Sequence, residues 1–135
     1  MSHFTVVKTK LIDRQALVKA LNDLGFKNIE LHDAAQHLYG YRGDQRAQTA
    51  EVIIRRKYIG RASNDIGFKL SQDGTYTAVI SEYDRSKYGQ EWLNRLSQRY
   101  AYHIARSKLT EQGFDLVSEE TEQDGRIHLV LRRAG

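Results

Sequence analysis

The chain has 135 residues, no cysteine and no proline, with a formal net charge of +4 and a sequence pI near 9.4. Its length fits one domain, 1–135, that buries roughly 65–70% of its unfolded surface. The absence of cysteine excludes disulfides, thiolate zinc sites, iron–sulfur clusters and thiol nucleophiles. No apolar run approaches the ~20 residues of a transmembrane helix, so we expect no membrane span and a place in the cytoplasm or a plastid stroma.

The first half of the chain predicts a strand, a helix and a run of further strands. Residues 4–10 read as a strand with Phe4, Val6 and Val7 turned inward. Asp13 caps a helix whose apolar residues recur at helical spacing, and Gly25 ends it. The strands that follow are expected over residues 28–32, 36–42 and 49–57.

The second half predicts two hairpins with a long helix between them. The hairpin strands are expected over residues 65–70 with 75–82, and 116–120 with 126–132. Their turns are Asp73-Gly74 and Asp124-Gly125. Asp84 or Ser86 caps the helix, which runs to about Gln112. Its inward face is apolar and consists of Trp92, Leu93, Leu96, Tyr100 and Ile104.

The predicted order of elements is therefore β-α-β-β-β-β-β-α-β-β. Hairpins outnumber crossover connections in this order, which favours antiparallel pairing. We expect an α+β fold with a single, mostly antiparallel sheet and two helices on one face. An edge strand of that sheet would allow dimerisation by sheet extension, and the oligomeric state stays open.

The sequence carries none of the common catalytic motifs. It has no phosphate loop, no Gly-x-Gly-x-x-Gly and no Gly-x-Ser-x-Gly. The interval between His32 and His37 falls on an expected loop, where turn chemistry around Asp33 explains the pattern better than a metal site. His103 borders the apolar face of the long helix and is expected to be a satisfied, half-buried histidine. We predict no catalytic residue, metal or cofactor, and lean toward a protein that is not an enzyme.

Three clusters combine positive charge with tyrosine. The first lies on one side of the long helix, and we call it the Arg/Tyr stripe: Arg95, Arg99, Tyr102 and Arg106. The other two are Tyr39, Tyr41, Arg42 and Arg46, and Arg55, Arg56, Lys57 and Arg61. Arginine and tyrosine are common anchors of protein interfaces, and they also bind phosphate and stack on bases. An ordinary solvated surface would look similar, so all three interpretations stay open.

Several segments carry a resemblance to a known family. The chain opens with Met1-Ser2-His3-Phe4-Thr5, and Gln98-Arg99-Tyr100-Ala101-Tyr102 lies in the long helix. Further segments of the same kind are Leu11-Ile12-Asp13, Leu17 to Gly25, Asp65 to Phe68, and Tyr88-Gly89. Together they resemble a small hypothetical reading-frame family of cyanobacteria and algal plastids, catalogued as a domain of unknown function. The resemblance implies a cyanobacterial or plastid setting, in housekeeping or photosynthesis, and no particular reaction.

The leading hypothesis is a non-enzymatic binding or accessory module that docks on a protein complex through the Arg/Tyr stripe. The first alternative is a nucleic-acid-binding protein that uses the other two clusters. The second is an enzyme or small-ligand carrier with a pocket between the helices and the sheet, near His103 and Trp92.

Overall fold

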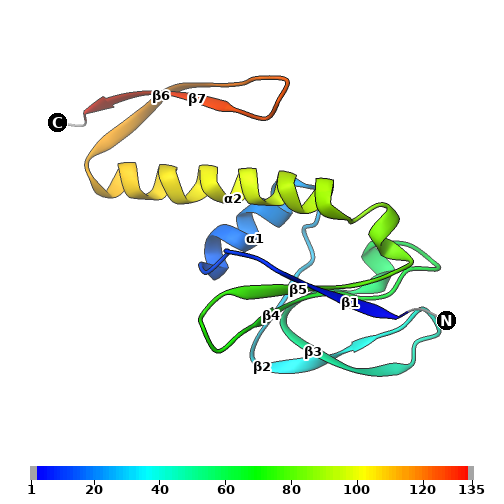
Figure 1. Cartoon of the computed structure of the whole chain (residues 1–135). Helices are drawn as coiled ribbons and strands as arrows, with labels where there is room; N and C mark the ends of the chain where they lie inside the picture. Colours follow the sequence, from blue (N-terminus) through cyan, green and yellow to red (C-terminus); the bar gives the residue numbers. More distant parts are fainter. Residues whose placement is uncertain (1–2, 134–135) are drawn as a thin grey trace.

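In the computed structural model, an antiparallel sheet is covered on one face by two helices (Figure 1). The structure describes residues 3–133, so Met1 and Ser2 of the opening segment lie outside the described residues. The elements are β1 (Phe4–Lys8), α1 (Arg14–Asp23), β2 (Glu30–Tyr39), β3 (Gln45–Ile54), η1 (Arg56–Tyr58), β4 (Ile66–Leu70), β5 (Tyr76–Ser81), η2 (Asp84–Ser86), α2 (Gln90–Glu111), β6 (Phe114–Thr121) and β7 (Ile127–Arg133). The predicted α+β class, the antiparallel pairing and the placement of both helices on one face are confirmed.

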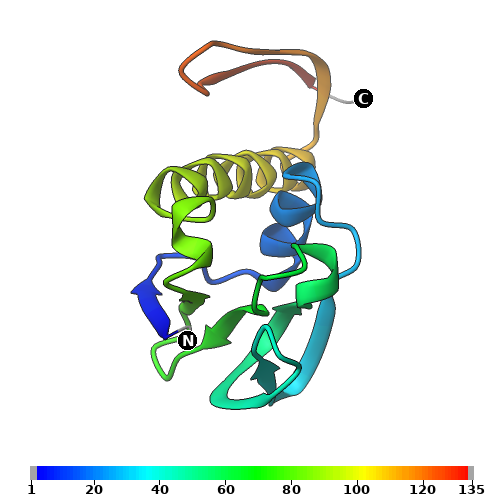
Figure 2. The ribbon, with the colours of Figure 1, turned by 90° about the vertical axis from the view of Figure 1, so that its right-hand side faces the viewer.

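Two details of the sheet differ from the prediction. The five-stranded sheet has the order β1-β5-β4-β3-β2, and β6 and β7 form a two-stranded sheet of their own. The last hairpin cannot join the main sheet because α2 lies between them (Figures 1 and 2). The strands expected over 28–32 and 36–42 are one strand, β2, whose pairing with β3 is irregular between Leu31 and Gln36. The observed order is thus one strand shorter than the predicted one.

The helix boundaries follow the predicted signals at three of four ends. Asp13 caps α1, accepting a hydrogen bond from the Ala16 amide at 2.9 Å. Both helices end before a glycine with positive φ, 104° at Gly25 and 87° at Gly113. The predicted cap of α2 is wrong, because Asp84 and Ser86 form the separate turn η2 and the N-cap of α2 is Gly89.

The main core fills the space between the helices and the sheet. Trp92 is 4% exposed, and its ring centroid lies 5.3 Å from that of Tyr88 and 6.1 Å from that of Phe26. Phe68 meets the same indole from the sheet at 6.5 Å. Leu17 of α1 is fully buried in this cluster. The predicted inward faces of both helices are therefore the ones that build the core.

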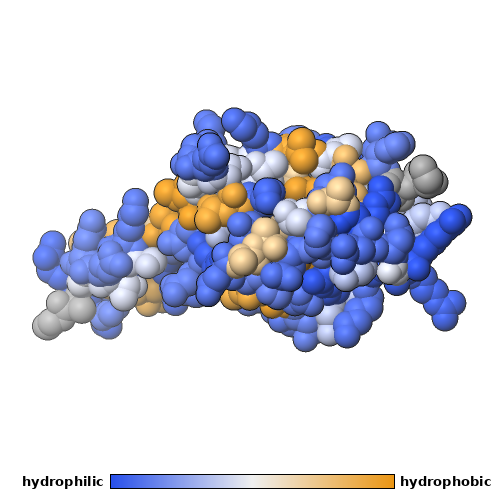
Figure 3. Space-filling model, turned by 90° about the horizontal axis from the view of Figure 1, so that it is seen from below, coloured by the Kyte–Doolittle hydropathy of each residue, from blue (hydrophilic) through white to orange (hydrophobic). Residues whose placement is uncertain are grey.

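A second, smaller core lies on the face of the sheet away from the helices. The outer half of the β2–β3 hairpin covers this face, so that Leu38 and Ala50 pack with Ile53 and Val79. This face is largely hydrophilic, with a few separate hydrophobic patches (Figure 3). Phe4 packs against the second core, but Val6, expected to face inward, is 69% exposed at the sheet edge.

Candidate partner-binding site on helix α2

The Arg/Tyr stripe forms one contact unit on α2. Its spacing of three and four residues places the side chains on one side of the helix. The guanidinium carbons of Arg99 and Arg106 lie 4.4 and 5.9 Å from the centroid of the Tyr102 ring. Arg106 also donates from Nη1 to the Tyr102 hydroxyl at 2.8 Å. Arg95, one turn earlier on the same side, is exposed. The structure therefore brings the predicted stripe together.

Tyr102 is held rigidly at the centre of this unit. It is only 6% exposed. Burial raises the pKa of Tyr102 above its ordinary value, and its hydrogen bond with Glu119 of β6 adds to the increase, against the opposing effect of Arg106. The phenol thus links α2 to the β6–β7 hairpin and stays protonated. A fixed, buried tyrosine between two arginines holds both guanidinium groups in defined positions on this side of α2.

An acidic residue of α1 fixes the stripe from the other side. Asp23 accepts hydrogen bonds at Oδ2 from Arg99 Nε at 2.8 Å and from His103 Nε2 at 2.6 Å. Burial acts to raise the pKa of Asp23, but these bonds from His103 and Arg99 outweigh it and lower the pKa below its ordinary value. His103 is accordingly the satisfied, half-buried histidine that the sequence predicts. Sequence reasoning missed Asp23, because it lies 76 residues from Arg99.

Beside the stripe, α1 and α2 enclose an open groove of about 480 Å³. Its lining consists of Lys19, His103, Arg106, Ser107, Thr110 and Glu111. Among residues 3–133, Lys19, Arg95 and Arg106 form no ion pair with a carboxylate. The groove is therefore mixed in character, with unpaired positive charge on both walls and a carboxylate at one end.

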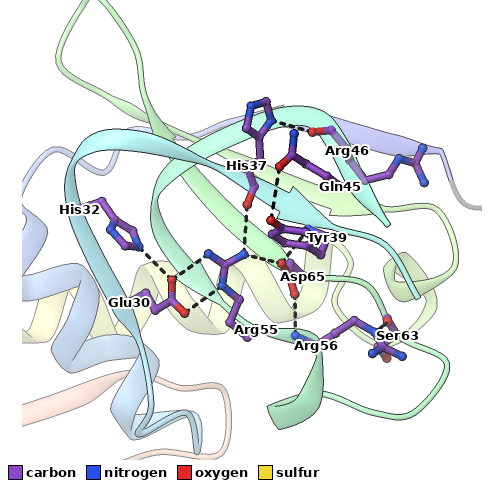
Figure 4. A network of polar contacts seen from close by, with 10 residues as sticks. All are labelled: Glu30, His32, His37, Tyr39, Gln45, Arg46, Arg55, Arg56, Ser63 and Asp65. Carbon is purple, nitrogen blue, oxygen red and sulfur yellow. Dashed lines mark hydrogen bonds and ion pairs between the residues drawn. The ribbon is translucent and has the colours of Figure 1, made fainter. Parts of the chain in front are cut away.

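Residues of the other two clusters meet in a polar network beside strands β2 and β3 (Figure 4). Arg55 bonds Glu30 from Nε at 2.9 Å and from Nη2 at 2.8 Å, and bonds Asp65 from Nη1 at 2.8 Å. Asp65 is fully buried and also accepts from the amides of Tyr39 and Arg56, each at 2.7 Å. Arg55 is thus taken up in internal ion pairs.

Arg56 is engaged in the same way, but with backbone oxygens. Its side chain donates to the carbonyls of Tyr41, Arg61 and Ser63 at 2.6, 2.7 and 3.0 Å. These bonds hold the segment 61–65 against the tip of the β2–β3 hairpin. Two of the four arginines and lysines in this cluster therefore stabilise the fold instead of facing a ligand.

The remaining members of these clusters lie around the hairpin tip and near η1. Arg42 and Lys57 are exposed and lie over tyrosine rings, Tyr41 at 5.3 Å and Tyr58 at 5.0 Å. Tyr39 donates to Gln45, and Arg46 lies over the ring of Phe4 at 5.4 Å. Arg61 is exposed. The structure joins both clusters on one side of the molecule, away from the Arg/Tyr stripe.

The residues that the sequence suggested for a metal site or a pocket are not brought together by the fold. His32 bonds Glu30 at 2.8 Å, and His37 bonds the Arg46 carbonyl at 2.8 Å. Within residues 3–133 no group of three or more metal-ligating side chains is present. Trp92 belongs to the packed core, whereas His103 faces the groove between the helices. The two residues expected to share a helix–sheet pocket are thus separate, one in the core and the other at the groove.

Taken together, the fold and the site define an α+β protein in which a buried tyrosine of α2 orders two arginines. The chain belongs to the family described as "Protein of unknown function (DUF1257)", which matches residues 20–130. It is 33% identical over 136 residues to "Uncharacterized protein ycf35" of Cyanophora paradoxa, with 98% of each chain covered. The proteins of the same description from Guillardia theta and Pyropia yezoensis are 31% and 29% identical over 138 residues, again with 98% of each chain covered.

These relatives are encoded in algal plastid genomes, which confirms the resemblance drawn from the sequence. No solved structure matches the chain. Over the described residues, neither helix combines the length and the apolar character needed to cross a membrane.

Proposed function

We propose that the chain is a non-enzymatic binding module that docks on a protein complex through the Arg/Tyr stripe and the adjoining groove. One observation carries the proposal: Tyr102 is fixed between two arginines, next to positive charges that have no carboxylate partner among the described residues. Arginine is one of the residues enriched at the energetic centres of protein interfaces, and side chains that are already fixed lose little entropy on binding. The buried Tyr102 ring therefore supports the proposal by holding Arg99 and Arg106 in place.

The chemistry of the surface favours an acidic partner. Lys19 and Arg106 present charge on the two walls of the groove, so a carboxylate-bearing surface would gain ion pairs on both sides. The plastid relatives support a setting in a plastid stroma or a cyanobacterial cytoplasm. We take residues 1–135 to act as one domain, since β6 meets α2 through Glu119 and Tyr102.

A comparison of charge-reversal variants tests this proposal. The bait is the tagged full chain, expressed in a cyanobacterium or alga that has lost its own copy, and co-purifying proteins are quantified by mass spectrometry. Arg95→Glu/Arg106→Glu should lose the specific partners of the wild type. The matched control is Arg42→Glu/Lys57→Glu, with the same change in charge on the other side of the molecule. If both double variants retain the same partners, the stripe is not the docking surface.

Nucleic-acid binding is less well supported, because Arg55 and Arg56 already serve internal contacts. Phosphate contacts would make retention weaken steeply as salt rises from about 50 to about 200 mM. We expect no such salt-dependent retention on single-stranded or duplex DNA or RNA. Tight binding at low salt that Arg42→Glu/Lys57→Glu abolishes would favour the alternative instead.

A further inference from the structure

Strand β1 is a free edge of the main sheet. It pairs on one side with β5, and the Glu82 amide bonds the His3 carbonyl at 2.7 Å in the same register. In an antiparallel ladder, hydrogen-bonded pairs alternate with non-bonded ones. His3, Thr5 and Val7 thus use their polar groups on β5, and Phe4, Val6 and Lys8 direct theirs outward. Figure 2 shows β1, in dark blue, at this free edge below α2.

A groove of about 370 Å³ runs between this edge and α2. The apolar part of its lining consists of Val7 and Leu11 from the β1 segment and Leu93 and Tyr100 from α2. The polar part includes Gln90 and Ser97 of α2. An exposed strand edge next to a helix is the geometry in which an extended peptide adds as a further strand. Alternate side chains of such a peptide would then enter the groove.

Positive charge surrounds the edge. Lys8 and Lys10 are exposed at its C-terminal end. At the other end, Arg85 donates from Nη1 to Thr5 Oγ1 at 3.2 Å and forms no ion pair with a carboxylate among residues 3–133. Two exposed carboxylates lie near the edge: Asp73 interacts with Lys8, and Glu82 is paired with His3 through its amide. With Lys8, Lys10 and Arg85 against these two, the edge keeps an excess of positive charge, and this excess lies at its C-terminal end.

We propose that β1 and α2 form a second docking site, which takes an extended segment of another protein, with acidic residues alternating with apolar ones, as an additional strand of the sheet. The segment would bond the outward polar groups of Phe4, Val6 and Lys8 and place its apolar side chains against Leu93 and Tyr100. Its carboxylates, on the face away from α2, would meet Lys8 and Lys10. This site lies on the opposite flank of α2 from the Arg/Tyr stripe and does not depend on it.

A second copy of the chain fits this edge poorly. In a two-fold antiparallel pair centred on Val6, Lys8 of each copy would lie opposite Phe4 of the other, so neither copy would bring a carboxylate to the lysines of the other. The charge of the edge thus favours an acidic segment of a different protein over self-association.

The test is a selection from a random peptide library displayed on phage, with the full-length protein as the target. The variant Val6→Pro removes one outward N–H but leaves the ladder to β5 intact, and proline is tolerated at such edge positions. Val6→Thr is the matched control that retains the N–H. We expect enriched peptides in which apolar and acidic residues alternate. As synthetic peptides they should bind Val6→Pro at least about tenfold more weakly than the wild type, and Val6→Thr within about twofold.

Amide hydrogen exchange of the wild type gives a readout that does not depend on how well Val6→Pro folds. A bound peptide should slow exchange at Phe4, Val6 and Lys8 much more than at Thr5 and Val7, which are already bonded to β5. Enrichment of no peptide, of basic peptides, or of peptides that bind Val6→Pro equally well would overturn the proposal. So would a concentration-dependent dimer of the wild type that Val6→Pro dissolves.

Discussion

Arg55 donates two hydrogen bonds to the carboxylate of Glu30, 2.9 Å from Nε to Oε2 and 2.8 Å from Nη2 to Oε1. This bidentate pair lowers the pKa of Glu30 from 4.5 to about 2. It joins the beginning of β2 to the end of β3, so its loss loosens the edge of the sheet that carries the second core. The ion pair is half-exposed, and solvent reduces its contribution to stability.

The Glu30 pair predicts acid sensitivity. A carboxylate with a depressed pKa stabilises the folded state above its unfolded pKa, and that contribution disappears as the pH falls from about 4.5 to about 2. Glu30→Gln should therefore be less stable than the wild type near neutral pH, and the difference should shrink steadily through this window. Urea unfolding over a pH series measures it. A difference that is the same at both ends of the window would show that Glu30 is not held by Arg55 in solution.

Asp65 is predicted to be essential for the fold. Its buried carboxylate accepts hydrogen bonds from Arg55, from the Tyr39 amide and from the Arg56 amide. Asp65→Ala leaves these donors without their partner and should cost about 3 kcal/mol or more of unfolding free energy. Asp33→Ala removes a fully exposed carboxylate and should unfold like the wild type. Equal denaturation midpoints for the two variants would contradict the role of the network.

Gly67 is predicted to tolerate no side chain. A Cβ at this position would lie 2.7 Å from the Ala50 Cβ and 3.0 Å from Leu38 Cδ2. Gly67→Ala should destabilise the protein by about 1–3 kcal/mol through overpacking. The double variant Gly67→Ala/Ala50→Gly moves the methyl group across the contact and should recover part of the loss. Strictly additive effects in chemical denaturation would show that β3 and β4 do not approach so closely.

Trp92 provides an intrinsic probe of the main core, since the chain contains a single tryptophan. Its indole is 4% exposed and packs edge-on against Tyr88. The folded protein should therefore show blue-shifted emission that acrylamide quenches weakly, with a red shift on unfolding. Strong quenching in the native state would mean that the space between helices and sheet is open, as a ligand pocket would require.

Local signals in the sequence predict local structure well here. The Asp13 cap, the glycine ends of both helices and the Asp73-Gly74 hairpin depend on residues within a few positions of each other. The apolar spacing of α2 likewise indicates its buried face. The Arg/Tyr stripe belongs to this group, because helix geometry alone places its members on one side.

The features that the sequence does not reveal depend on contacts between distant segments. Asp84 reads as a helix cap, but it is 3% exposed and accepts from the Asn64 amide, 20 residues away. In the sequence, Arg55 and Arg56 resemble exposed surface charges. In the fold, Arg55 bonds Glu30 and Asp65, and Arg56 bonds nearby backbone carbonyls. Val6 alternates like a core residue, yet the second core extends only to Phe4. The spacing of apolar residues along the chain does not show which distant segments come into contact.

The most direct test of the central claim is site-specific photo-crosslinking in living cells. A photoreactive amino acid replaces Arg95 or Arg106 in the full chain, and as matched controls it replaces Arg42 or Lys57. Docking through the Arg/Tyr stripe predicts a discrete crosslinked product, with the same protein captured from both stripe positions and not from the controls. Crosslinks that are absent from the stripe, or equally strong at all four positions, would contradict the claim.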